Sequence, residues 1–462
     1  MKNKKMLSEG NVASALMKLS LPATIAMIVN ALYNIIDTIF VGQFVGDMGI
    51  AGLGVSFPLQ MLALGIAGMF GMGAASIASR QMGAGDMDEA NKTVSTMIFY
   101  NFIIMLLLSI LSMIFIEPLL SLFGATDKIY PYAFDYLKII IPGFVAFSFS
   151  VGMNNIVRAE GNANVAMISM LIGAVGNIVL DYIFMGILNL GIEGAAFATV
   201  TSQCLSAAFL ISYMISGKSH FRISLKKVAR KLTLVIDIIK IGVSSFLTQA
   251  GTSVLVIIIN KSLIFYGGAY GEIAIAIYGV INKVLSFMIM PEIGIRQGTQ
   301  PLLGYAYGDN NYHRVNEIIK VAMKTLFVYS IISYVVVMIF ARQIISLFGI
   351  DSNLLDMAGQ SLQIVIAAVF IVPLQVLGSS LFQSIGRTVP ALITSMLRQF
   401  ICLIPLVIII PYVTGLGITG IWIAFPIADL ISSLVSGYMM KKELNKICSD
   451  DFSELSMSSV SK

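Results

Sequence analysis

The stretch that decides the fold is LPATIAMIVNALYNIIDTIFVG at Leu21–Gly42, an apolar run that contains one charged residue, Asp37. A run of this length is enough for a helix to cross the hydrocarbon core of a bilayer, which takes about 20 residues. It is too long for the core of a signal peptide, and no small-residue cleavage site follows it. We therefore expect a retained first membrane helix.

The composition extends this expectation to the whole chain. Of the 462 residues, 57% are hydrophobic and 11% are charged, and the mean hydropathy is +0.90. A soluble domain is about a quarter charged, so these values exclude a soluble enzyme, a disordered chain and a nucleic-acid-binding protein. The apolar runs do not alternate as the strands of a transmembrane β-barrel do. The sequence therefore predicts an all-α polytopic membrane protein, because helices satisfy their backbone groups within lipid.

Apolar runs separated by polar residues, glycine or proline are typical of successive membrane spans. With the N-terminus placed in the cytoplasm, 23 of the 29 lysines and arginines fall on the cytoplasmic side and four on the outer side. This bias predicts a multi-pass plasma-membrane protein, which we expect to be bacterial, with both termini cytoplasmic. The twelve predicted spans are 17–40, 50–76, 94–116, 131–155, 163–186, 195–216, 238–264, 272–295, 319–341, 356–381, 390–411 and 418–440.

Short repeated motifs divide the chain into two parts. SLFG occurs at Ser121–Gly124 and again at Ser346–Gly349, and LGIEGA at Leu190–Ala195 resembles LGITGI at Leu416–Ile421. The offsets are 225 and 226 residues. Since six spans are an even number, both parts enter the membrane from the same side, which predicts two parallel six-helix repeats. The expected divisions are an N-terminal bundle 1–216, a basic cytoplasmic linker 217–237, and a C-terminal bundle 238–462 with a short cytoplasmic tail.

The linker contains the basic stretch GKSHFRISLKKVARKL. From Ser224 onward, Leu225, Val228 and Leu232 fall on one face of a helix. The pattern predicts a short amphipathic helix on anionic lipid headgroups, so membrane lipids are expected partners. A regulatory site is the alternative interpretation.

Ionisable residues within a span are functional candidates, because their burial is costly. In the first span Asn30, Tyr33, Asn34 and Asp37 are three or four residues apart and so share one helix face. A stripe of polar side chains is expected to face protein or water. An interfacial aspartate at a helix end is the alternative for Asp37.

The fifth span contains a second deep acid. Gly173, Asn177 and Asp181 recur every four residues, so the amide can reach the carboxylate and the glycine permits close helix packing. Asp181 is expected at a membrane depth similar to that of Asp37. Two such carboxylates can take up a proton or bind sodium together with amide and hydroxyl oxygens, whereas a lone hydrogen-bonded acid is the alternative.

The second half has other candidates. Glu292 and Arg296 are four residues apart at the predicted inner end of span 272–295, which favours a local ion pair or a role in gating or substrate contact. Asp429 can pair with Lys283 across helices. No nucleophile–base, metal or nucleotide motif is present, so we expect no enzyme activity, no cofactor and no structural metal.

The quoted first span, with Tyr33-Asn34, Asp37-Thr38 and Val41-Gly42, resembles the first helix of multidrug and toxic compound extrusion (MATE) transporters. GNIVLDYIF at Gly176–Phe184 is similar to the fifth helix of that family, and GAAFAT at Gly194–Thr199 to the sixth. The resemblance covers almost the whole chain. It implies twelve helices in two bundles around a central V-shaped cavity.

The resemblance also implies site residues. A bend is implied at Pro22. Together with the residues singled out above from their positions in the spans, the substrate or gating candidates are Pro22, Tyr33, Asn34, Glu292, Arg296 and Asp429. The second half departs from a family branch that carries acids midway along spans 7 and 10, so coupling is expected in the first half. The implied cation-coupling residues are Asp37, Asn154, Asn177, Asp181 and Thr199. All of them except Asn154 would bind a sodium ion directly.

The expected function is a proton- or sodium-coupled secondary antiporter that exports amphipathic, often cationic drugs from the cytoplasm by alternating access, acting as a monomer. A flippase for a lipid-linked saccharide is the alternative within the superfamily. Its cavity would need many cations to hold pyrophosphate, and the predicted spans contain few. A passive channel and a membrane-embedded enzyme are alternatives from other classes. Paired acids favour a carrier over a channel, and the missing catalytic motif argues against an enzyme.

Overall fold

The computed structural model describes residues 6–229, 232–348 and 354–460. Within these ranges the chain is helical and contains no strand. Eleven of the described helices are long and apolar enough to cross a membrane. A twelfth span results if the bent pair Leu355–Ile371 and Pro373–Ile385, with an angle of 48° between its parts, crosses as one. The predicted all-α membrane fold is confirmed.

The first half contains the helices that precede the linker. Asn11 and Asp86 cap two of them, because each side chain accepts a hydrogen bond from a backbone N–H in the first turn. Helix α7 continues directly into a π-helix, η1. The bounds are α2 Val12–Phe44, α3 Asp47–Gly83, α4 Met87–Ile114, α5 Ile116–Leu122, α6 Tyr130–Ala159, α7 Ala163–Asp181, η1 Tyr182–Ile187 and α8 Gly191–Ile215.

The second half is more broken than the first. A second π-helix, η6, interrupts its fifth span. Several helices run well past the predicted spans, because a helix does not stop where the hydrocarbon core ends. The bounds are α9 Leu232–Gly267, η3 Gly268–Tyr270, α10 Gly271–Gly308, α11 Tyr312–Ser346, α12 Leu355–Ile366, η5 Val369–Ile371, α13 Pro373–Ile385, α14 Thr388–Met396, η6 Leu397–Leu403, α15 Ile404–Thr414 and α16 Ile418–Val460.

The linker does not form the predicted amphipathic helix. Its only regular element in the described residues before α9 is a 3₁₀ turn, η2, at Leu225–Lys227. Side chains of α4 hold the linker backbone: Asn91 accepts a hydrogen bond from the Arg222 N–H at 2.7 Å, and Thr96 accepts one from the Ala229 N–H at 2.9 Å. Backbone donors used in this way are not available for a helix ladder, so the amphipathic-helix prediction is wrong.

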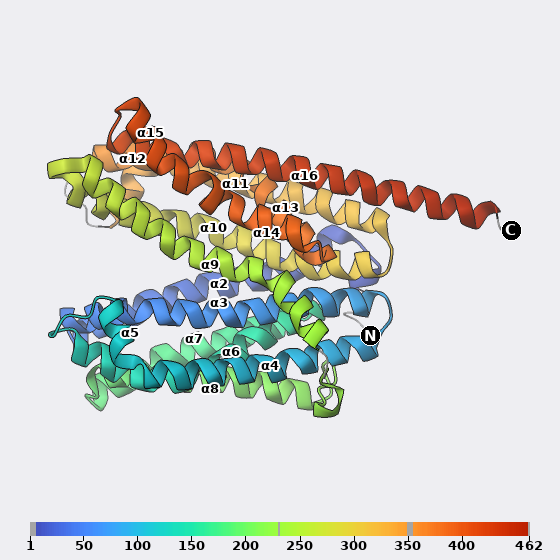
Figure 1. Ribbon diagram of the computed structural model, residues 1–462, viewed down its shortest axis with the longest axis horizontal. Helices are drawn as coiled ribbons and strands as arrows, with labels where there is room; N and C mark the ends of the chain where they lie inside the picture. The colour runs from blue at the N-terminus through green and yellow to red at the C-terminus, as the bar shows by residue number, and fades with distance from the viewer. Residues whose placement is uncertain (1–5, 230–231, 349–353, 461–462) are drawn as a thin grey trace.

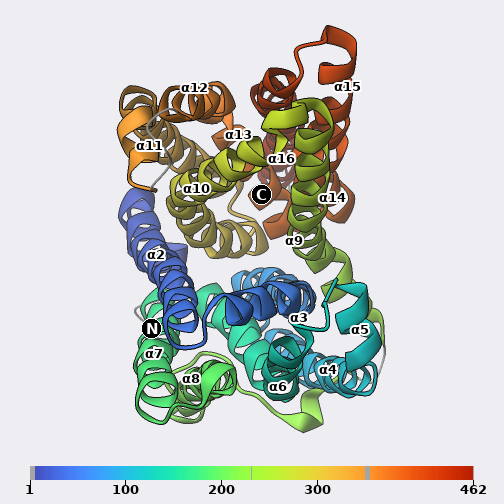
Figure 2. The same ribbon diagram turned by 90° about the vertical axis from the view of Figure 1, so that its left-hand side faces the viewer.

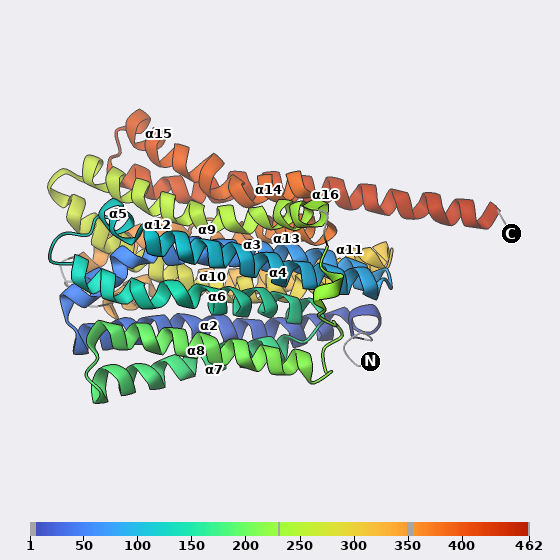
Figure 3. The ribbon, with the colours of Figure 1, turned by 60° about the horizontal axis from the view of Figure 1, so that its bottom comes forward.

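The helices form two bundles whose axes run along the length of the molecule. Helices α2–α8 make one bundle and α9–α16 the other (Figures 1 and 2). The chain leaves α8, passes the end of α4 and enters α9 at one end of the molecule (Figure 3). We call this the linker end and the opposite one the far end. The first turns of α2 also lie at the linker end (Figure 1).

The buried core shows how the two bundles meet. One apolar cluster contains residues of both bundles and uses the parts of the helices near the linker end, for example Leu16, Phe70, Leu302 and Leu381. Toward the far end each bundle has its own cluster, with Val41 to Ala196 in one and Leu255 to Ala428 in the other. The bundles therefore pack together at the linker end and have separate cores at the far end.

Glycines make the contact at the linker end close. A Cβ on Gly73 of α3 would lie 2.0 Å from the carbonyl oxygen of Ile238 in α9, and one on Gly242 would lie 1.8 Å from that of Met69. Neither position has room for a side chain, so the two helix backbones approach directly. The glycine-rich stretch 65–85 thus serves helix packing.

Candidate functional site: two buried acid clusters and a polar pocket

Asp37 and Asp181 come together in the first bundle. Helix α2 packs against α7, and the two carboxyl groups lie within interaction range of each other. Asp181 is 0% exposed. Among the described residues, no N–H or hydroxyl group donates a hydrogen bond to either of its carboxylate oxygens or to Oδ1 of Asp37. Buried oxygens without donors are costly, so this cluster is suited to receive a proton or a cation.

Two further predicted residues border the pair. Asn177, one turn before Asp181 on α7, is 1% exposed and donates a hydrogen bond from Nδ2 to Oγ1 of Thr199 in α8 at 3.4 Å. Its Oδ1 has no partner among the described residues. α7 ends at Asp181, where η1 begins. Such π-helical segments often occur at functional sites, and here one follows the acid directly.

Two tyrosines complete the cluster. Tyr33 lies near both carboxyl groups, as its position one turn before Asp37 suggests. Tyr136 of α6 lies near the same two acids and Thr199. Sequence reasoning missed Tyr136, since one tyrosine in an apolar span has no distinguishing signal. Asn34 interacts with Tyr33 and also donates to the carbonyl oxygen of Asn30 in its own helix, at 2.7 Å.

Two residues implied by the resemblance have other surroundings. Asn154 of α6 donates from Nδ2 to the carbonyl oxygen of Ala166 at 2.9 Å, and its Oδ1 accepts a hydrogen bond from Arg158. Pro22 is buried within α2, which continues as one helix across it. These contacts place Asn154 on the Arg158 side of the bundle.

A second cluster of buried charges lies in the second bundle. Glu292 of α10 is 2% exposed and accepts a hydrogen bond from Oγ of Ser330 in α11 at 3.0 Å. Asp429 of α16 is 1% exposed, and its Oδ1 accepts a hydrogen bond from Nε of Arg398 in η6 at 2.5 Å. Arg398 and Asp429 are also the charged groups near Glu292. This cluster differs from the first because it contains its own cation.

The partners in this cluster correct two expectations. Glu292 and Arg296 form no ion pair in the described residues; Ser330 of the neighbouring helix binds Glu292, and Nε of Arg296 has no partner. Glu292 also lies mid-helix rather than at an inner end, because α10 continues to Gly308. Asp429 pairs with Arg398 and not with Lys283, whose side chain is exposed.

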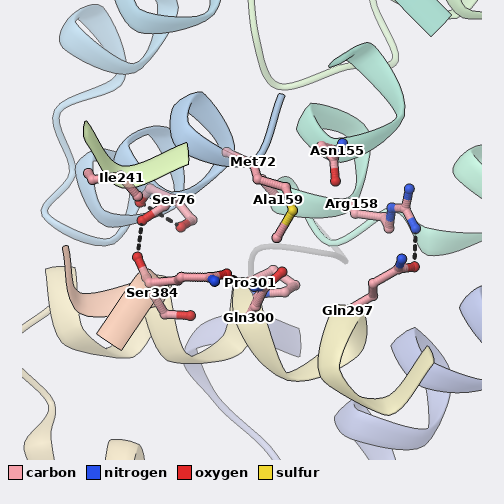
Figure 4. Close-up of a pocket in the computed structure, with 13 residues that line it drawn as sticks. Met72, Ser76, Asn155, Arg158, Ala159, Ile241, Gln297, Gln300, Pro301 and Ser384 are labelled. Atoms are coloured by element: carbon pink, nitrogen blue, oxygen red, sulfur yellow. Dashed lines mark hydrogen bonds between the residues drawn. The ribbon is translucent and has the colours of Figure 1, made fainter. Parts of the chain in front are cut away.

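A polar pocket lies between the bundles near the linker end (Figure 4). Two hydrogen bonds cross it from bundle to bundle: Oγ of Ser76 donates to the carbonyl oxygen of Gln383 at 2.5 Å, and Arg158 donates to Oε1 of Gln297. From the sequence, Arg158 counted only as a cytoplasmic charge. The pocket is lined by Met72, Ala75, Ser76, Ser79, Asn155, Arg158, Ala159, Ile241, Gln297, Gln300, Pro301, Gln383 and Ser384.

Comparison with solved structures defines the class of protein. A crystal structure of MATE in complex with MaL6 superposes with a TM-score of 0.91 at 26% identity, covering 97% of this chain and 100% of that chain. An outward-facing conformation of a multidrug resistance MATE family transporter of the MOP superfamily gives a TM-score of 0.89 at 27% identity, covering 97% and 99%. The fold is that of a multi-pass membrane transporter.

The MatE family model matches residues 22–183 and 248–409, once in each bundle, and the chain belongs to this family. Similar curated relatives are multidrug export proteins MepA of two staphylococci. The one from Staphylococcus saprophyticus is 28% identical over 433 residues, 93% of each chain. The one from Staphylococcus haemolyticus is 25% identical over 444 residues, 96% of each chain.

Proposed function

We propose that this chain is a bacterial antiporter that exports amphipathic, often cationic drugs in exchange for protons or sodium ions. Its likeness to the MepA multidrug export proteins along more than nine tenths of the chain supports the substrate class. The separate cores of the two bundles at the far end, and their shared core at the linker end, support an alternating-access cycle.

The observation that carries the coupling assignment is the set of buried oxygens around Asp181. Both oxygens of Asp181, Oδ1 of Asp37 and Oδ1 of Asn177 receive no hydrogen bond from an N–H or hydroxyl group of the described chain. No described salt bridge involves either aspartate. Oxygen ligands of this kind suit a proton or a hard cation such as sodium. We therefore assign coupling to the first bundle and a structural or substrate-selecting role to the compensated cluster in the second.

The distribution of lysine and arginine along the chain supports an orientation with the linker end in the cytoplasm. The linker end carries the linker, whose sequence is basic, so we place this end in the cytoplasm. The structure then has its bundles joined on the cytoplasmic side. Drug uptake from the cytoplasm requires Ser76 and Arg158 to part from Gln383 and Gln297. Binding of a cation at the far end would favour one of the two arrangements by its differential affinity.

The test uses everted membrane vesicles and the fluorescent cation ethidium. A proton gradient and a sodium gradient are imposed separately, and vesicles without the protein are the control. We expect one gradient to drive ethidium accumulation in the vesicles and a protonophore or sodium ionophore to abolish it. Ethidium movement that neither gradient accelerates would overturn cation-coupled export.

A further inference from the structure

Arg158 is a buried cation whose partners are all neutral. It lies in the last turn of α6 and is 9% exposed. Its Nε donates to the carbonyl oxygen of Asn154 at 3.2 Å, and its terminal nitrogens donate to Oδ1 of Asn154 and Oε1 of Gln297. No described salt bridge involves Arg158, and it is the only charged residue that lines the pocket.

A buried guanidinium normally pairs with a carboxylate, because charge-assisted hydrogen bonds offset the loss of hydration. The C-terminal dipole of α6 stabilises the charge in part. It does not account for the direction of the side chain, which extends across the interface to α10 of the other bundle (Figure 4). The two ends of the guanidinium thus hold one amide oxygen from each bundle, where a two-oxygen carboxylate would be a stronger partner.

Gln297 is the partner that must leave during transport. It belongs to α10, so parting the bundles at the linker end breaks its hydrogen bond to Arg158. Arg158 then faces a space with apolar walls from Met72, Ile241 and Pro301. When the bundles close again, Oε1 of Gln297 returns and competes for the same nitrogens. A negatively charged group of a solute would therefore bind Arg158 while the linker end is open. Gln297 would displace that group when the linker end closes.

We propose that Arg158 is a specificity-determining residue whose guanidinium binds the carboxylate of those amphipathic aromatic solutes that carry one. The proposal rests on the alternating-access function proposed above. Arg158 captures the carboxylate in the arrangement open to the cytoplasm, and Gln297 displaces it when the linker end closes.

The test compares two dyes that differ at one group. Rhodamine 110 carries a free carboxylate, and rhodamine 123 is its methyl ester with the same ring system. Binding to the detergent-purified full chain is measured by fluorescence polarisation. We expect Arg158→Gln to weaken rhodamine 110 binding about tenfold, the loss of one charge-assisted contact, and to change rhodamine 123 less than twofold. Arg387→Gln is the control, since it removes a cation paired with Glu443 outside the pocket.

A second variant tests the displacement step in the opposite direction. Gln297→Met keeps the size of the side chain and removes the competing oxygen, so rhodamine 110 should bind several-fold more tightly and rhodamine 123 unchanged. Equal losses for both dyes in Arg158→Gln, or equal binding of both dyes in all variants, would overturn the assignment. Arg158-dependent discrimination without export of either dye from everted vesicles would support the carboxylate site and refute the exporter function.

Discussion

At the scale of single residues, the two acid clusters differ in whether their charge is compensated. Asp37 and Asp181 face each other without a cation, whereas Asp429 binds Arg398 at 2.5 Å and Glu292 binds Ser330. Asp181 is buried and Asp37 partly buried, and two neighbouring acids without a cation are costly unless they bind a proton or a cation. A compensated pair resists a change of charge, because loss of one partner strands the other. The clusters should therefore respond differently to neutralisation.

Neutralisation of either first-bundle acid is expected to stop coupled transport. Asp37→Asn and Asp181→Asn keep the size of the side chain and remove its charge, so the cation loses its ligand while the helices still pack. We expect gradient-driven ethidium export to fall to the background of protein-free vesicles, with normal amounts of protein in the membrane. Asp88→Asn is the control, because Asp88 forms an exposed ion pair with Lys227 at 2.7 Å. Normal export by Asp37→Asn would contradict the coupling assignment.

Neutralisation of Asp429 is expected to destabilise the fold. Asp429→Asn removes the carboxylate that Arg398 binds. Because the Arg398 side chain is 19% exposed and Glu292 lies nearby, the cost should fall below the value of about 3–5 kcal/mol for a fully buried pair. Thermal unfolding of the purified protein should show a lower midpoint, and the double variant Asp429→Leu/Arg398→Met should recover it. Glu443→Gln should cost less than about 1 kcal/mol, since its partner Arg387 is partly exposed. An unchanged midpoint in Asp429→Asn would show that the pair is not needed for stability.

Glu292→Gln is expected to change drug selection without uncoupling. The hydrogen bond from Ser330 can be kept by the amide, and the orphaned oxygens of Asp181 are untouched. Cation counterflow induced by each of several drugs, measured in proteoliposomes, should persist but change in relative rate from drug to drug. If Glu292→Gln abolished counterflow for every drug while Asp37→Asn retained it, coupling would belong to the second bundle.

At the scale of the elements, glycines determine how closely the bundles meet at the linker end. A Cβ on Gly294 of α10 would lie 2.1 Å from Oγ1 and 2.8 Å from the Cα of Thr24 in α2, whereas a Cβ on Gly279 of the same helix meets nothing within 4 Å. The two positions have the same helix propensity but different neighbours. They form a matched pair for testing the contact between α10 and α2.

Gly294→Ala is expected to favour separation of the bundles at the linker end. The extra methyl group would cost about 1–3 kcal/mol in the closed contact and nothing once the helices part. Spin labels at Ala84 and Lys441, both exposed near that end, should report a longer mean distance in Gly294→Ala. Gly279→Ala should give the distance of the parent protein. The same distance in both variants would show that this contact does not control closure.

At the scale of the whole molecule, the property to be tested is the orientation of the chain in the membrane. We expect the linker to be cytoplasmic and the loop between α5 and α6 to be external. In a background without the native cysteines, a membrane-impermeant maleimide added to intact cells should label Asp127→Cys and miss Lys226→Cys; both positions are exposed. Detergent-permeabilised cells should label both. External labelling at position 226 would reverse the topology.

The fold was largely predictable because hydrophobic runs and lipid leave helices as the only choice. Helix lengths were less predictable: α10 extends to Gly308, past the expected end of span 272–295, because its last turns pack against the other bundle instead of lipid. The predicted amphipathic helix in the linker is absent for a similar reason. Its periodicity was suitable, but side chains such as Asn91 of α4 bind the backbone donors that a helix would need.

The sequence by itself determined the membrane class, the two repeats and the deep acids Asp37 and Asp181, since these follow from local composition and spacing. Only the tertiary structure decided the partners: Tyr136 beside the acids, Arg398 rather than Lys283 for Asp429, and Gln297 for Arg158. A buried charge must find a partner among helices distant in sequence. Which helix supplies that partner depends on how the helices pack and on how the bundles meet, and no local pattern encodes it.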